Sequence, residues 1–325
     1  MFVNDLELDI VSTDLTELER IVEMLRPNVT HVKENHEYTG REVAIFADCH
    51  SMYEPTLAIL EDMRRRGISE IYSLGDNVGL GPNPVEVFDL LDEFGVQSVA
   101  GNAEYYNTIG TDAFPYLTDA RLENQLWTER KLGPERIKDL RMYPVSRDLL
   151  LGDKKIALCH FANDVRWDFR DRSVHTYAGS YGRSNTEQLR YTNSEDYLRK
   201  ITNCVVSNKG NISAVKGYMA SREEPIFGGK KVTDYDYVLQ GHYHFDLEDT
   251  LDDTEVYTLR AVGMGYEGSE KDTEACYYVL KERKDGDVDI EKIYVPFNRN
   301  ALLSSIHTCD LPSKDRVLSY VKKSR

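Results

Sequence analysis

Residues of the kinds that bind metal ions stand at the ends of five apolar runs in this sequence. Asp48 and His50 follow "VAIF", Asp76 follows "EIYSLG", Asn102 follows "VQSVAG", His160 follows "KKIALC", and His242 and His244 follow "YDYVLQG". Each run has the length and composition of a buried strand, and ligands of open α/β sheets bind beyond the carboxyl ends of the strands. These side chains are therefore expected to meet at one edge of a sheet.

These residues are more informative together than any one of them is alone. A Gly-Asp pair after a strand is usually only a turn, and a lone histidine is more often a hydrogen-bonded polar residue than a ligand. Four of the eight histidines of the chain, however, stand at strand ends beside two aspartates and an asparagine. Imidazole, carboxylate and amide ligands together suit Mn, Ni, Fe, Zn or Co, whereas a calcium or magnesium site is built almost wholly from oxygen.

Strand and helix patterns alternate in the segment that carries the first three of these runs. Strand-like runs at 43–46, 70–74 and 96–100 are separated by amphipathic segments at 55–67 and 83–95, the second with Pro84 at its first position. This βαβαβ series predicts a parallel sheet with helices on its faces. Closely spaced strand patterns between 235 and 297 predict a largely antiparallel second half.

One main domain is predicted at 41–300, with an extension at 1–40, a polar helical insertion at about 105–144, and a tail at 301–325 that packs on or trails the domain. We find no apolar run of the roughly 20 residues that a membrane-spanning helix needs. The acidic N-terminal segment does not resemble a secretion signal, and the five cysteines are scattered without a zinc-ribbon spacing. A cytoplasmic location is therefore expected.

In order, "DCH", "GDN", "GNAE", "CH" and "GHYH" resemble the pattern D-x-H, G-D, G-N-H-D/E, H and G-H-x-H of the calcineurin-like metallophosphoesterases. The turn "GDNVGLGPNPVEV" is similar to that of a bacterial and archaeal branch of small phosphodiesterases, and the similarity spans roughly residues 42 to 297. The resemblance implies an α/β fold in which a two-sheet β-sandwich is flanked by helices, here with a helical insertion.

The same resemblance implies a centre of two divalent metal ions. Asp48, His50, Asp76 and His244 would hold the first ion, and Asp76, as the bridge, would hold the second with Asn102, His160 and His242. Two ions about 3.5 to 4 Å apart clamp a phosphate oxygen while a bridging hydroxide attacks in line. Asp76, Asn102, His160 and Glu104 are accordingly predicted as catalytic residues, with Glu104 orienting a ligand from behind.

The third residue of the "GNAE" turn departs from the family pattern, because Ala103 stands where a histidine would assist the leaving group. A positioned general acid raises the reaction rate by about 10² to 10⁴-fold. Its loss therefore predicts an altered reaction rather than no reaction. Cys49 is either a substitute proton donor or a buried filler. The Asn-Pro-Gly-Ser turn of the branch is also missing, since residues 260–268 read "RAVGMGYEG".

Two residues are predicted to contact substrate. Arg166, six residues past His160, could bind a phosphate bidentately, although surface arginines are mostly solvated. Tyr105 could stack on a base or ring, although with 21 tyrosines in the chain ordinary packing is the simpler role.

The function predicted is metal-dependent hydrolysis of a phosphodiester or an activated phosphomonoester, on a small molecule or a nucleotide. A non-catalytic metal-binding scaffold on the same fold is a first alternative. A nuclease is the second, but the net charge of -16 disfavours nucleic acid as a partner. No membrane partner is expected, and a homo-oligomer is left open.

Overall fold

The computed structural model describes residues 38–109, 119–144, 146–160, 234–242, 244, 246–251, 253–264 and 274–322. The predicted extension at 1–40 therefore lies almost wholly outside the described residues. None of the described helices is long and apolar enough to span a membrane.

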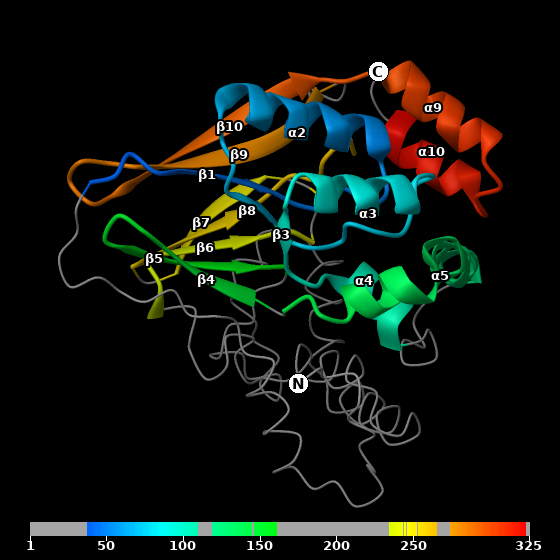
Figure 1. Ribbon diagram of the computed structural model, residues 1–325, viewed down its shortest axis with the longest axis horizontal. Helices are drawn as coiled ribbons and strands as arrows, with labels where there is room; N and C mark the ends of the chain where they lie inside the picture. Colours follow the sequence, from blue (N-terminus) through cyan, green and yellow to red (C-terminus); the bar gives the residue numbers. More distant parts are fainter. Residues whose placement is uncertain are drawn as a thin grey trace, which may run out of the picture.

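Within these ranges, two five-stranded sheets pack face to face (Figure 1). The first sheet has the order β10-β9-β1-β2-β3 and consists of Val288–Pro296, Glu274–Glu282, Glu42–Phe46, Ile71–Ser73 and Gln97–Ser98. The second has the order β4-β5-β6-β8-β7 and consists of Ser146–Leu151, Lys154–Cys159, Tyr237–Gln240, Thr254–Thr258 and Leu247–Leu251. With helices on the outside, this is the predicted α/β sandwich.

Strand β1 shows why the sandwich forms, because it is buried on both faces. Val43 and Ile45 belong to the core between the two sheets, whereas Ala44 and Phe46 belong to the core beneath the helices. Successive side chains of a strand point to opposite faces, so one apolar run serves two cores. The parallel order β1-β2-β3 confirms the predicted βαβαβ series.

The prediction of a largely antiparallel second half is confirmed for β9, which runs antiparallel to β10 and β1, and for the pair β7 and β8, but not for β6. Strand β6 pairs in parallel with both β5 and β8, and β9 and β10 join the first sheet, where β9 runs antiparallel to β1. Strands β7 and β8 do form an antiparallel pair, but β7 occupies the sheet edge and leaves β8 to lie against β6. Strands β6 and β7 therefore follow each other closely along the chain but are not neighbours in the sheet.

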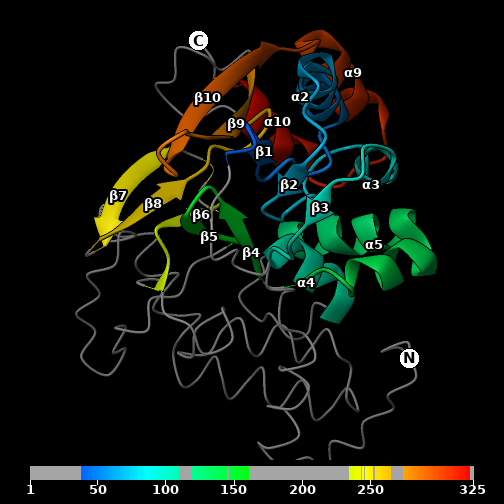
Figure 2. The same ribbon diagram turned by 60° about the vertical axis from the view of Figure 1, so that its left-hand side comes forward.

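Helices α2 (Tyr53–Arg66) and α3 (Pro84–Glu93) cover the outer face of the first sheet (Figures 1 and 2). Helix α2 ends at Gly67, whose φ of 77° allows its N–H to bond to the last carbonyls of the helix. Its buried face, which includes Ile59 and Met63, packs with Val87 and Leu90 of α3 over the strands.

Four more helices frame the end of the sandwich at which the predicted ligands lie. Helices α4 (Asn102–Ile109) and α5 (Asp119–Leu140) cover most of the predicted insertion, and α9 (Arg299–Thr308) and α10 (Lys314–Lys322) cover most of the predicted tail. Trp127 of α5 packs with Leu302 of α9 and Val317 of α10 in one apolar cluster. The tail helices therefore pack on the domain and lie next to the insertion.

Candidate metal centre

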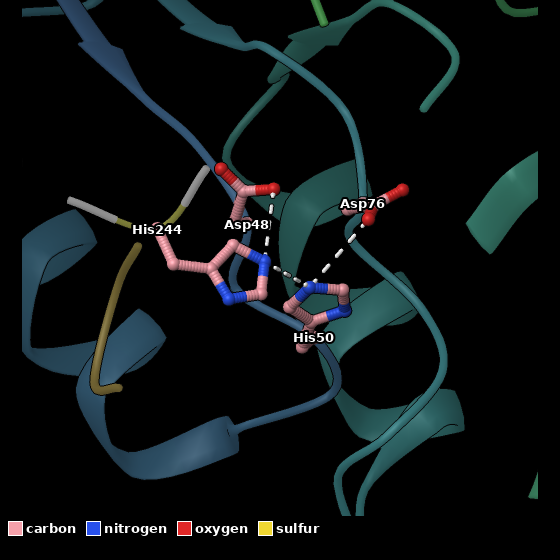
Figure 3. Close-up of side chains that lie close together, drawn as sticks. All are labelled: Asp48, His50, Asp76 and His244. Carbon is pink, nitrogen blue, oxygen red and sulfur yellow. Dashed lines mark hydrogen bonds and ion pairs between the residues drawn. The ribbon is translucent and has the colours of Figure 1, made fainter. Parts of the chain in front are cut away.

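Four predicted ligands form one compact group in the loops that follow β1, β2 and β6. One ligand atom from each of Asp48, His50, Asp76 and His244 lies within 4.8 Å of all the others (Figure 3). The Nε2 atoms of His50 and His244 are 3.0 Å apart. His50 Nε2 lies 3.5 Å from Asp76 Oδ2, and His244 Nε2 lies 3.6 Å from Asp48 Oδ1. Two nitrogens and two carboxylates converging on one point fit a divalent cation.

The remaining predicted ligands form a second group beside the first. Asn102 Oδ1 lies 2.8 Å from His242 Nδ1 and 3.1 Å from His160 Nε2. The two histidine nitrogens are 3.2 Å apart, and His160 Nε2 lies 3.6 Å from Asp76 Oδ1. Asp76 therefore turns Oδ2 toward the first group and Oδ1 toward the second. The seven predicted ligands are all brought together, with one carboxylate between the two groups.

The electrostatics of the centre keep its histidines neutral. Burial lowers the pKa of His160 to about 4 and the pKa of His242 to about 3, the latter with a further contribution from the charge of His160. Burial also lowers the pKa of His50 and of His244. A neutral imidazole keeps a free lone pair, which is the form that binds a metal ion.

Backbone carbonyls fix the orientation of two of these rings. His160 Nδ1 lies 2.8 Å from the carbonyl oxygen of Leu74, and His50 Nδ1 lies 3.3 Å from that of Val78. A carbonyl only accepts, so Nδ1–H donates in each case and Nε2 carries the lone pair. Both Nε2 atoms face the ligand groups described above.

The turns that carry the ligands are strained. Five of the seven residues have positive φ values: Asp48 (57°), His50 (44°), Asp76 (52°), His242 (74°) and His244 (66°). Residues other than glycine seldom adopt this conformation, and such strain concentrates at functional sites. These left-handed turns bend the chain sharply at the strand ends.

Two glycines of the motifs make room for carboxylates. A Cβ atom on Gly101 would lie 2.3 Å from Asp76 Oδ1, and one on Gly241 would lie 2.7 Å from Asp48 Oδ2. No real Cβ atom tolerates such contacts. The glycines before Asn102 and His242 are therefore needed so that the backbone can approach the two carboxylates closely.

Glu104 braces the turns from behind. It is fully buried, and its carboxylate accepts hydrogen bonds from the backbone N–H groups of Asp76 (2.9 Å), Asn77 (2.8 Å) and Gly101 (2.7 Å). Burial, with the charge of Asp76, raises the pKa of Glu104 to about 7. Glu104 thus joins the "GDN" and "GNAE" turns through their main chains and holds Asp76 between the two ligand groups.

Cys49 lies in the core and not in the site. It belongs to the apolar cluster beneath α2 and α3, and its Sγ lies 3.5 Å from Asn77 Oδ1. Burial raises the pKa of its thiol. Of the two roles left open by the sequence, filling the core therefore accounts for Cys49.

The two ligand groups open into a cavity of about 120 Å³. Its walls include His50, Asp76, Asn102, Ala103, His242 and His244 from the centre. The opposite walls come from the insertion and the tail and contribute residues that the sequence did not single out: Arg121, Asn124, Gln125, Arg316 and Tyr320. An arginine on a polar helix face has no sequence signal that separates substrate binding from solvation.

The two predicted substrate contacts are not placed at this cavity. Arg166 lies outside the described residues. Tyr105 is part of α4, but its side chain is also outside the described part. Its neighbour Tyr106 is buried and lines the cavity.

Two crystal structures show the same fold. A hypothetical protein from Pyrococcus horikoshii is 17% identical, with a TM-score of 0.56 over 86% of this chain and 97% of that one. A metallophosphoesterase from Sphaerobacter thermophilus is 18% identical, with a TM-score of 0.53 over 88% of this chain and 100% of that one.

In sequence, an uncharacterized protein of Methanocaldococcus jannaschii is 33% identical over 118 residues, which is 36% of this chain. The match spans 48% of that relative's length, about half of it. The family model of the calcineurin-like phosphoesterases matches residues 41–246, which include all seven predicted ligands and Glu104. The chain therefore belongs to the calcineurin-like phosphoesterase family.

Proposed function

We propose that this protein hydrolyses a phosphodiester or an activated phosphomonoester at a centre of two divalent metal ions. The placement of Asp76 carries the proposal, because its Oδ2 lies 3.5 Å from His50 and its Oδ1 lies 3.6 Å from His160 in the other ligand group. A carboxylate with one oxygen in each of two donor groups is suited to bridge two cations.

Asp48, His50, Asp76 and His244 would hold one ion, and Asp76, Asn102, His160 and His242 the other. When bound, such ions polarise a phosphoryl oxygen and lower the pKa of bound water, so no protein base is needed. The mixed donors favour Mn, Ni, Fe, Zn or Co. Glu104 is proposed as a positioning residue that holds Asp76 through backbone hydrogen bonds.

The substrate follows from what the cavity lacks at Ala103. The methyl group of Ala103 lines the cavity and packs with Val78 and Leu132. None of these three side chains can donate a proton. A general acid contributes about 10² to 10⁴-fold, and most for a leaving group of high pKa. We therefore propose substrates whose leaving group departs without protonation by the protein, on a small molecule or a nucleotide.

The test is turnover by metal-stripped protein reloaded with Mn, Ni, Zn or Mg. We expect bis-p-nitrophenyl phosphate to be hydrolysed with at least one of the first three ions, and Asp76→Asn to abolish turnover. Asp92→Asn, an exposed aspartate of α3, is the matched control and should leave turnover unchanged. Bound ions without turnover in the wild type would instead favour a metal-binding scaffold.

The substrate class and the cellular location are proposed from the sequence alone. The net charge of -16 favours a small substrate over nucleic acid, and the scattered cysteines favour the cytoplasm. A native mass measurement would decide between a monomer and the homo-oligomer left open above.

A further inference from the structure

Two arginines enter the metal-centre cavity from walls that are not part of the ligand loops. Arg121 lies in the first turn of α5, and Arg316 lies in α10. Both line the cavity that also exposes His242 and His244. Figures 1 and 2 show α5 below and α10 above, so the two arginines come from two separate helices at this end of the sandwich.

Neither arginine forms an ion pair with a carboxylate of the described residues. Other described arginines do, as Arg64 with Glu61, Arg136 with Asp89 and Arg283 with Asp285 show. Within the described part of the chain, the guanidinium group of Arg316 forms one long hydrogen bond, 3.5 Å, from Nη2 to the Tyr320 hydroxyl. In a chain with a net charge of -16, partly buried cations without a carboxylate partner among the described residues are cations that an anionic ligand can neutralise.

The two arginines differ in their relation to the metal ligands. Arg121 belongs to α5, which packs against the ligand turn through Leu132 and Ala103, whereas α10, which carries Arg316, packs on Trp127 of α5. Arg121 therefore comes from the helix that contacts the ligand loops, and a phosphate held at the ligand groups would lie on its side of the cavity. Arg316 shares α10 with Val317 and Tyr320, and these residues line the cavity together with Ser313, which directly precedes the helix. The charge of Arg316 is therefore available to a second anionic group.

We propose that Arg121 and Arg316 select phosphate esters that carry a second anionic group, with Arg121 binding the reacting phosphate and Arg316 binding the second phosphate or carboxylate. This selectivity rests on the proposed function, since it assigns the substrate of that same centre. A guanidinium binds such oxygens through two parallel N–H bonds, which adds geometric selectivity to charge. Esters with one anionic group would lack the second contact.

Calorimetric titration of the full chain, loaded with Mn, tests the assignment with two probes: inorganic phosphate and methylenediphosphonate. Metal content is measured before and after, because diphosphonates chelate. The wild type should bind the diphosphonate at least about 10-fold more tightly than phosphate, as expected for one added charge-assisted contact. Arg316→Gln should remove this preference and leave the Kd for phosphate unchanged. Arg121→Gln should weaken both probes about 10-fold or more.

Two further variants control for charge and for folding. Arg130→Gln, an exposed arginine of the same helix as Arg121 that does not line the cavity, should change neither Kd. Arg316→Lys keeps the charge without the planar fork and should retain part of the preference. Equal affinity of the wild type for both probes would overturn the proposal, as would an Arg316→Gln variant that weakens both probes alike or neither.

Turnover of bis-p-nitrophenyl phosphate, measured on the same samples, separates this proposal from the proposed function. Absence of turnover with the diphosphonate preference intact would reject hydrolysis and keep the two-anion site. Turnover without the preference would reject the two-arginine assignment and keep hydrolysis.

Discussion

The backbone N–H of Ala103 donates a hydrogen bond of 2.6 Å to Oδ1 of Asp76. The residue that replaces the histidine of the family pattern therefore still contacts the carboxylate between the two ligand groups, but it does so through its main chain. Under the proposed function, this position would therefore lack proton donation by its side chain but keep its contact with the bridging carboxylate.

The variant Ala103→His should restore a proton donor. We expect kcat/KM to rise by up to about 10²-fold for esters with poor leaving groups and to change little for p-nitrophenyl esters. The measurement is the dependence of log kcat/KM on the pKa of the leaving group, which should become less steep. Ala103→Phe supplies similar bulk without a proton, and an equal effect of both variants would contradict the assignment.

The variant Glu104→Gln should weaken the whole centre without touching a ligand. Three backbone N–H groups donate to this carboxylate, and an amide offers a single acceptor oxygen. Leaving a buried donor unpaired costs about 1–3 kcal/mol, which urea unfolding would detect. Metal affinity should fall by about 10- to 100-fold. Glu135→Gln, an exposed glutamate of α5, should affect neither.

The variant Gly101→Ala should disturb the second ligand group more than the first. Its Cβ would lie 2.3 Å from Asp76 Oδ1 and 2.9 Å from His160 Nδ1. We expect the bound metal, counted by elemental analysis, to fall from two ions per chain toward one. Gly95→Ala is the control, because its φ of 64° is strained but no atom lies within 4 Å of its Cβ. It should lose about 1 kcal/mol of stability and keep its ions.

The metal-free protein should lose stability as the pH falls from about 6.5 to 4. Burial holds the pKa of His160 at about 4 and that of His242 at about 3, whereas the unfolded chain titrates near 6.5. In this window the unfolded state binds more protons, so acid favours unfolding by up to about 1.4 kcal/mol per pH unit for each histidine.

Glu104 and Asp48 act in the opposite direction above their unfolded pKa values, because burial raises the pKa of both carboxyl groups, but four ligand histidines have lowered pKa values. Urea unfolding at pH 7.5 and pH 5 measures the slope. His160→Gln should make it shallower, and His307→Gln, at an exposed helix position, should not. A steeper slope in His160→Gln would show that the histidine is charged in the folded state.

The convergence of the seven candidate ligands at strand ends could be predicted because their signals are local. A polar residue directly after an apolar run indicates a strand end, and the glycines before Asn102 and His242 mark close approaches of the backbone. The sheet that a given strand joins could not be predicted from such local signals. The run at β9 is apolar on both faces, so nothing in its residues told whether it would join β1 or the strands of the second sheet.

The cavity walls could not be predicted for a related reason. Arg166 was chosen for its nearness to His160 along the chain, whereas Arg121 and Arg316 reach the cavity through the packing of α5 and α10. That packing depends on Trp127 meeting Leu302 and Val317, contacts between residues far apart in sequence. Helix patterns identify an apolar face but not the partner that covers it.

The hydrogen bond from the backbone N–H of His242 to Asp48, 3.0 Å long, joins loops of the two different sheets across 194 residues of chain. Each ligand group likewise takes residues from loops of both sheets. Cations bound there would therefore act as cross-links that fasten one end of the sandwich. In the unfolded chain, bringing these loops together would cost conformational entropy, whereas in the folded chain that entropy is already lost. The centre would therefore bind ions only after folding, and the bound ions would oppose separation of the sheets.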